Sequence, residues 1–129
     1  MSKKMFLTIV LLALALALAA CGKDQGGETN PAGLANPASV YCQGLGYTEE
    51  TRENDAGQYG VCIFPDGSEC DSWAFLGGTC GQEYSYCLQQ GHTLQSSAGS
   101  NIATCVFEDG STCPEYDYQQ GMCQPGDNK

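Results

Sequence analysis

The sequence predicts a small, disulfide-rich α+β protein of two tandem units, each with a short helix, a β-hairpin and a short helical turn stapled by two disulfides. Nine cysteines in 129 residues are typical of a disulfide scaffold rather than of a large apolar core. Eight of them form two sets of four, with steps of 20, 8 and 10 residues and then of 18, 8 and 10. Residues 62–70 and 105–113 also share a Phe-x-Asp-Gly-Ser sequence. This pattern indicates an internal duplication.

Residues 1–20 have the pattern of an export signal. Lys3 and Lys4 form a short positive segment, and residues 5–20 follow with Thr8 as their single polar residue. This apolar run suits a signal peptide and is shorter than the roughly 20 residues that a transmembrane helix needs.

A cysteine stands directly after this run. The residues Leu18, Ala19, Ala20 and Cys21 resemble the lipobox of bacterial lipoproteins. The resemblance implies cleavage before Cys21, acylation of its sulfur (diacylglycerol and palmitate) and anchoring in the lipid bilayer of the cell envelope. Several acyl chains together give stable anchoring. By the same resemblance Gly22, where an aspartate would retain the protein in the inner membrane, favours the outer membrane of a Gram-negative host. The rival interpretation is an ordinary secretory signal with an incidental cysteine.

The mature chain is strongly acidic. Removal of residues 1–20 leaves 3 basic against 15 acidic residues, so the formal charge is 3 − 15 = −12. This charge excludes a nucleic-acid binder and opposes contact with anionic lipid. Residues 21–35, rich in glycine and polar residues, are predicted to be the lipidated cysteine and a flexible tether. Residues 125–129 are predicted to be a tail.

Unit one, residues 36–80, begins with a predicted helix. Asn36 suits its N-cap, Pro37 its first turn, and Gly44 or Gly46 its end. A variable polar loop is expected over residues 47–58.

A hairpin follows this loop. Residues 59–64 are apolar enough for a strand, and Pro65, Asp66 and Gly67 suit a tight turn. A three-residue loop of this kind places Phe64 opposite Ser68 and Cys62 opposite Cys70.

Two interpretations remain for the residues after Cys70. Trp73 and Phe75, two apart, suit a strand. Asp71 and its counterpart Pro114 suit the first turn of a helix, with Gly78 and Gly121 past its end, and we favour this helical turn. Unit two, residues 81–124, lacks the Asn-Pro-Ala start, so it is predicted to be the less stable half.

The paired sets of cysteines predict two disulfides in each unit. Units this small need staples, and an exported chain meets an oxidising compartment. Cys62 and Cys70 can join each other or reach outward to Cys42 and Cys80, and the same choice holds for Cys87, Cys105, Cys113 and Cys123. The gaps are too wide for the Cys-x-x-Cys pairs of a structural zinc site, so no metal is expected.

Several motifs of unit one occur in a specific combination: Asn36-Pro37-Ala38-Ser39, Gly60-Val61-Cys62, Phe64-Pro65-Asp66-Gly67, Trp73-Ala74-Phe75 and Gly78-Thr79-Cys80. They resemble a small bacterial lipoprotein family, the domain of unknown function 333, whose members are often labelled haemolysins. The resemblance covers residues 36–80, and residues 86–123 as a degenerate second copy. It implies the location and the scaffold but no mechanism. Pro65, Asp71 and Trp73 are replaced in unit two by Glu108, Pro114 and Tyr116, so a function that needs them would belong to unit one.

No constellation in the sequence predicts catalysis or a cofactor. His92 is the one histidine and aligns with Tyr47, so it is interpreted as a loop residue. Asp66, Glu69 and Asp71 cluster near the hairpin without the alternation of a calcium loop. The chain is therefore predicted not to be an enzyme.

Four residues form the predicted contact surface: Pro65 and Asp66 at the hairpin turn, and Trp73 and Phe75 after it. The rival and favoured interpretation of the two aromatic side chains is core packing, because so small a unit has little else to bury.

These observations predict a membrane-anchored, non-enzymatic binding or structural module of the cell envelope, with an envelope or surface partner. One alternative is a protease inhibitor that presents residues 47–58 or 65–68 as a rigid loop. The other is a lytic protein, as the haemolysin label suggests. The sequence after residue 21 lacks the long apolar or basic amphipathic stretch that lysis requires.

Overall fold

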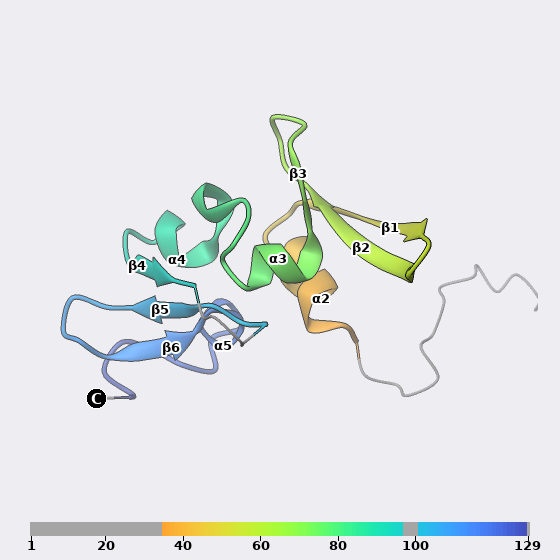
Figure 1. The fold of residues 1–129 in the computed structure, drawn as a ribbon. Helices are drawn as coiled ribbons and strands as arrows, with labels where there is room; N and C mark the ends of the chain where they lie inside the picture. Colours follow the sequence, from red (N-terminus) through yellow and green to blue (C-terminus); the bar gives the residue numbers. More distant parts are fainter. Residues whose placement is uncertain (1–34, 97–100, 129) are drawn as a thin grey trace, which may run out of the picture. The chain divides into compact units, whose positions relative to one another are not determined.

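The computed structural model describes residues 35–96 and 101–128, which lie in one compact body, Leu34–Lys129. The predicted signal peptide, Cys21 and most of the tether lie outside the described residues. The fold is a small α+β fold with antiparallel strands, as predicted (Figure 1). Its elements are α2 (Pro37–Gly44), β1 (Thr48–Asn54), β2 (Gly57–Ile63), β3 (Glu69–Asp71), α3 (Ser72–Leu76), η1 (Gln82–Tyr84), α4 (Tyr86–Gln89), β4 (Thr93–Gln95), β5 (Thr104–Val106), β6 (Thr112–Pro114) and α5 (Glu115–Gln119).

The first helix, α2, begins and ends where its sequence predicts. The Asn36 side chain accepts a hydrogen bond from the Ala38 N–H at 3.0 Å, and Pro37 occupies the first turn. Past the end of the helix, Gly46 has a φ of +83°, a conformation that glycine adopts without strain.

The polar segment after α2 is a strand, so the prediction of a loop over residues 47–58 was wrong. β1 pairs with β2 along its whole length, from Thr48 opposite Ile63 to Asn54 opposite Gly57. β1 is an edge strand of the order β1-β2-β3, and edge strands carry charged side chains readily. The segment was predicted as a loop because it is polar. The apolar residues of the hairpin lie on its partner strand, β2.

The second hairpin has the predicted register and settles the pairing of the cysteines. Cys62 lies opposite Cys70, and the Phe64 N–H donates to the Ser68 carbonyl at 2.9 Å. The two neighbouring cysteines bond outward rather than to each other. The disulfides of unit one are Cys42–Cys62 and Cys70–Cys80, with Cα separations of 5.8 and 5.9 Å.

The residues after β3 form a helical turn, as predicted. The Asp71 carboxylate caps α3 by accepting from the Trp73 and Ala74 N–H groups at 2.9 and 3.0 Å. In unit two, Pro114 stands at the corresponding N-cap of α5 and makes no side-chain hydrogen bond there.

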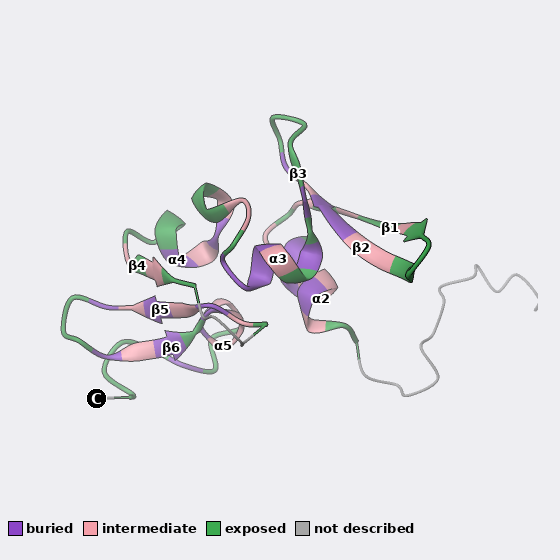
Figure 2. Cartoon of the chain, in the orientation of Figure 1, coloured by how far each residue is buried: buried purple, intermediate pink, exposed green. Residues whose placement is uncertain are grey.

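Unit two repeats the order of unit one, with a helix, three antiparallel strands and a terminal helical turn. Its strands β4, β5 and β6 each have three residues. Its disulfides are Cys87–Cys105 and Cys113–Cys123, with Cα separations of 5.6 and 5.8 Å. Buried residues gather where the helices meet the sheets of each unit, whereas most of β1 is exposed (Figure 2).

Each unit has its own core around four rings in a matched arrangement. The centroids of Phe64 and Phe75 lie 4.9 Å apart, as do those of Phe107 and Tyr118. The ring of Tyr47 meets Phe64 edge-on at 5.3 Å. The matching pair in unit two, His92 and Phe107, is also edge-on, at 4.8 Å. The fourth rings, Tyr41 and Tyr86, lie 5.1 and 4.9 Å from Phe75 and Tyr118.

Candidate functional site

The described cysteines are all joined in disulfides. This determines whether two groups of potential metal ligands can bind an ion. Glu49 lies beside Cys42 and Cys62, and Glu115 lies beside Cys87 and Cys105, with the ligand atoms of each group within 4.8 Å. In both groups the two sulfurs are bonded to each other. Neither pair offers the thiolates that a metal ion requires.

His92 lies in the loop between α4 and β4, as predicted, and its half-buried ring packs on the core of unit two. Its ring packs edge-on against Phe107 and lies 5.9 Å from Tyr118. It takes the position that Tyr47 takes in unit one, which the alignment of the two units had matched. Its Nδ1 is buried without a hydrogen-bond partner.

The four residues of the predicted contact surface separate in the structure. Pro65 and Asp66 are exposed at the hairpin turn, and Trp73 is 37% exposed. Phe75 is 1% exposed and lies in the core cluster of unit one, so its place in the contact surface was wrong. Phe75 faces inward because α3 turns this residue toward Tyr41 and Phe64 while Trp73 points outward.

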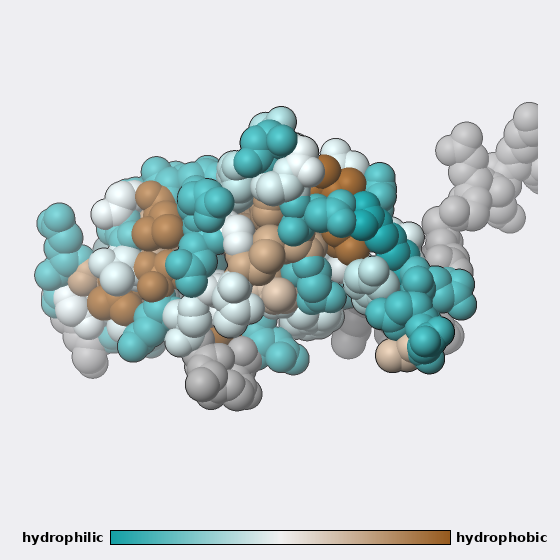
Figure 3. Space-filling view, turned by 45° about the horizontal axis from the view of Figure 1, so that its top comes forward, coloured by the Kyte–Doolittle hydropathy of each residue, from teal (hydrophilic) through white to brown (hydrophobic). Residues whose placement is uncertain are grey.

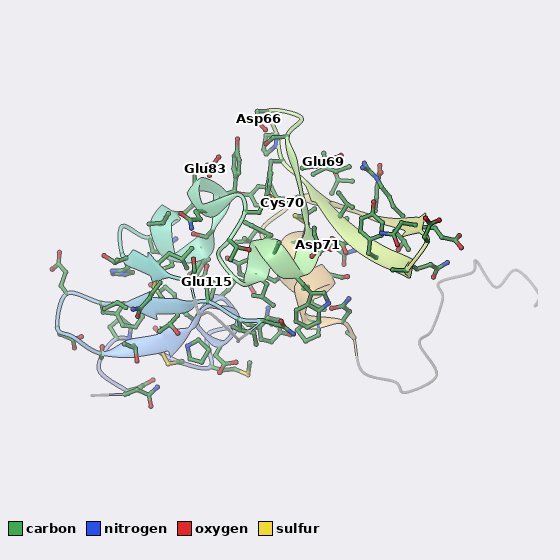
Figure 4. The ribbon with its side chains drawn as sticks, viewed as in Figure 1. Asp66, Glu69, Cys70, Asp71, Glu83 and Glu115 are labelled. Atoms are coloured by element: carbon green, nitrogen blue, oxygen red, sulfur yellow. A yellow bond between two sulfur atoms is a disulfide. The ribbon has the colours of Figure 1, made fainter. Side chains whose placement is uncertain are left out.

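Asp66 stabilises the turn at the tip of the hairpin through hydrogen bonds to Ser68. Its carboxylate accepts from the Ser68 N–H at 2.9 Å and from the Ser68 hydroxyl at 2.6 Å. These hydrogen bonds lower the pKa of Asp66, and a hydrogen bond to Asp66 raises the pKa of Tyr84. Figure 4 shows Asp66 at the tip of this hairpin.

The ring of Tyr84, in η1, stacks on Phe64 at 4.3 Å. The start of unit two thus packs against the core cluster of unit one.

Buried polar groups join the two units. Glu115, at the start of α5, is 1% exposed, and its Oε1 accepts from the Tyr41 hydroxyl and, at 3.0 Å, from the Cys87 N–H. The Tyr41 hydroxyl in turn accepts from the Tyr86 N–H at 3.0 Å. Glu115 Oε2 is buried without a hydrogen-bond partner. We name the Tyr41 hydroxyl, the Glu115 carboxylate and the backbone N–H groups of Tyr86 and Cys87 the inter-unit lock.

Burial controls the protonation of this lock. Removal from water raises the pKa of Glu115, and it also raises the pKa of Tyr41, to which the charge of Glu115 contributes. Sequence reasoning missed the lock, because a glutamate in the first turn of a helix has the pattern of an exposed residue. The one available signal is its alignment with Ser72, a small residue buried in unit one.

Unit one has its own carboxylate at the sheet. Glu49 accepts from the Ser39 hydroxyl of α2 and the Ser72 hydroxyl of α3, each at 2.7 Å. A Cβ on Gly60 would lie 2.4 Å from a carboxylate oxygen of Glu49, so a larger residue there would displace this side chain.

On β1 an arginine bridges two further carboxylates. Arg52 Nη1 and Nη2 donate to the two oxygens of Glu69 at 2.5 and 2.7 Å, and Nη2 lies 3.3 Å from Glu50. The side chains are exposed, and the guanidinium lowers the pKa of Glu69. Arg52 is the one lysine or arginine among residues 35–96 and 101–128.

The geometry thus describes a disulfide-stapled α+β scaffold. Residues 33–79 match the domain of unknown function DUF333, a match that covers fewer than half of the 129 residues. A protein of Archaeoglobus fulgidus described as an uncharacterized protein is 39% identical over 59 residues, which are 46% of this chain and 28% of that protein. The chain therefore corresponds to under a third of this relative's length. No solved structure matches.

These matches support the expected family for unit one. Within the described part of the chain, none of the helices has the length and apolar character needed to span a bilayer.

Proposed function

We propose that this chain is a lipid-anchored protein of the cell envelope that acts as a non-enzymatic binding and structural module. Acylated Cys21 would attach it to the bilayer, and residues 22–35 would hold the folded part away from the surface. The resemblance of residues 18–21 to a lipobox supports the anchor. Four disulfides support an oxidising compartment, because thiols in the cytosol are kept reduced.

One observation carries the non-enzymatic part of the proposal: the described cysteines, His92 and the buried Glu115 serve the scaffold. The cysteines are bonded in pairs, His92 packs among rings, and Glu115 joins the units. The exposed features are a charged sheet face and single apolar side chains, Trp73 at 37%, Leu88 at 39% and Met122 at 65%. Figure 3 shows the apolar patches interrupted by hydrophilic ones. Such a surface suits contact with a partner.

The proposal includes a second, diverged copy of the domain in residues 81–124. The matched disulfides and matched ring distances of the two units support it. Two linked copies raise the effective concentration of one binding unit when the other is engaged.

The anchor is tested by feeding cells of a bacterial host an alkyne-tagged palmitate and measuring label on the protein. We expect label on the wild type and none on Cys21→Ser, which should leave the membrane fraction. Cys42→Ser together with Cys62→Ser is the matched control and should keep its label. Equal label on the Cys21→Ser variant would contradict the anchor.

The binding function is tested by cross-linking the lipidated protein in its own cells and identifying captured molecules by mass spectrometry. Trp73→Ala and Met122→Ala remove one exposed apolar side chain each, one in each unit. A single envelope partner, lost in one variant and kept in the other, would support the module and locate its contact. A captured protease that the protein inhibits at near-equimolar ratio would replace the proposal with the inhibitor alternative. Release of dye from liposomes would replace it with the lytic one.

A further inference from the structure

The sheet of unit one has two faces with different neighbours. Glu49, Cys62 and Cys70 share one transverse row, and hydrogen bonds and a disulfide connect this row to α2 and α3. Because side chains alternate along a strand, their neighbours in sequence point to the opposite side. We name that side the outer sheet face; its central residues are Glu50, Arg52, Tyr59, Val61, Ile63 and Glu69.

An apolar stripe runs along β2 on the outer sheet face. Val61 is 3% exposed yet belongs to neither core cluster. Tyr59 and Ile63, two residues before and after it, are half-buried. In Figure 3, brown atoms are visible between teal ones on the side of the molecule that carries β1 and β2. The stripe is thus covered at Val61 and partly accessible at Tyr59 and Ile63, beside charged side chains.

The ion pair of Arg52 crosses this stripe. Arg52 lies opposite Tyr59, whereas Glu69 lies opposite Ile63, so the pair spans the sheet diagonally. Val61 stands between these two positions on β2, which accounts for its burial outside the core. The outer sheet face therefore already holds one guanidinium, between Glu69 and Glu50, above an aliphatic side chain.

The charge of this face favours a cation. Glu50 and Glu69 share Arg52, so two carboxylates on this face are balanced by one guanidinium. The described residues carry 13 of the chain's 15 acidic side chains, all but Asp24 and Glu28, against one arginine. A basic partner would meet excess negative charge around an apolar stripe.

Unit two does not repeat this surface. The positions of Val61 and Ile63 are taken there by Thr104 and Val106, and the neighbouring strands place Thr93, Gln95 and Thr112 beside them. These side chains are uncharged. The same scaffold thus carries the acidic, apolar surface in one unit and lacks it in the other, which supplies matched control positions.

We propose that the outer sheet face of unit one binds a basic segment of a partner protein, in which arginine or lysine alternates with aliphatic residues. A guanidinium or ammonium of the partner replaces Arg52 between Glu50 and Glu69, and its aliphatic side chains cover Val61 and Ile63. Arg52 therefore acts as an internal competitor for the site. This inference rests on the proposed binding function and names the chemistry of its partner.

The test uses the full lipidated protein in micelles of a neutral detergent and a fluorescent twelve-residue peptide in which arginine alternates with valine. Fluorescence anisotropy measures its dissociation constant. Arg52→Ala should tighten binding about two- to fivefold, because it removes the competing cation. Glu69→Gln and Ile63→Ser should weaken it by a similar factor. Val106→Ser and Glu108→Gln, in unit two, should leave it unchanged.

The sign of the Arg52→Ala effect decides the proposal. A peptide with glutamate in place of arginine should not bind, and thermal melting must show each variant folded. Equal binding of the basic peptide to all variants would overturn the proposal. Equal weakening by Glu69→Gln and Glu108→Gln would reduce the interaction to bulk charge and would also overturn it. No binding of either peptide would also overturn it. The palmitate and cross-linking experiments are independent of this peptide, so they would still decide the proposed function.

Discussion

Unit one has two seven-residue strands, β1 and β2, and holds Glu49 between two serine hydroxyls, whereas unit two has three-residue strands and buries Glu115 against unit one. The disulfides and the four rings keep the same spacing in both. The difference shows which parts of this scaffold are fixed. The disulfides and the core rings define the fold of both units. The polar residues on the strands and helices differ, so each unit makes different contacts.

The largest expected effect concerns the ring at the centre of each core. Phe75→Ala should reduce the free energy of unfolding by about 3–5 kcal/mol, because it leaves a cavity among the rings of unit one. Tyr118→Ala, at the matched position, should reduce it less, since Tyr118 is 9% exposed against 1% for Phe75. Urea unfolding followed by circular dichroism measures both. A larger loss for Tyr118→Ala would break the comparison.

The second prediction asks whether the units unfold together. Replacing Cys87 and Cys105 by alanine removes the clamp on an 18-residue span and should lower stability by roughly 3 kcal/mol. Trp73, the single tryptophan, lies in unit one and reports on it by fluorescence. The inter-unit lock should transmit the loss, so the Trp73 transition should move to lower urea with the rest. An unchanged Trp73 transition would show independent units.

The third prediction is a pH dependence that belongs to the lock. Burial raises the pKa of Glu115 above its value in the unfolded chain, so folding favours the protonated carboxyl. This contribution to stability is complete below the unfolded pKa and is lost as the pH rises through the folded pKa. Glu115→Gln should therefore gain stability relative to the wild type as the pH rises from acid toward neutral. Thermal melting across that range measures the difference.

The control for the lock is Glu49→Gln, because Glu49 accepts two hydroxyl donors in unit one and is only half-buried. This variant should not reproduce the pH-dependent gain. A parallel gain in both variants would assign the effect to overall charge instead.

The smallest expected effect concerns the helix caps. Asp71→Ala removes the side-chain acceptor of two N–H groups in α3 and should lower stability by about 1 kcal/mol. Pro114→Asp supplies the missing cap to α5 and should act in the opposite direction. Thermal melting of both variants tests this, and a loss of stability in Pro114→Asp would show that Pro114 has another task.

The local signals of the sequence predicted most of unit one. Asn36 and Pro37 set the start of α2, and the Phe-x-Asp-Gly-Ser turn set the register that places Cys62 opposite Cys70. These features depend on residues close in the chain, where capping and turn geometry act directly. The prediction that unit two is the less stable half stays a prediction, and its uncapped α5 and shorter strands support it.

Long-range contacts could not be predicted. β1 is polar, and its identity as a strand depends on pairing with β2. Glu115 and Tyr41 are 74 residues apart, so no local sequence pattern predicts their hydrogen bond. The spacing of Trp73 and Phe75 did not reveal which of the two faces the core, because the orientation of α3 decides it.

Each disulfide joins a cysteine to the next one along the chain, 42 to 62, 70 to 80, 87 to 105 and 113 to 123. For a chain threaded through a membrane from its N-terminus, both partners of a bond emerge before either partner of the following one. Oxidation in order of emergence therefore gives the native pairing directly. Such a protein matures with an oxidant alone, without the thiol–disulfide exchange that an isomerase catalyses for interleaved bonds.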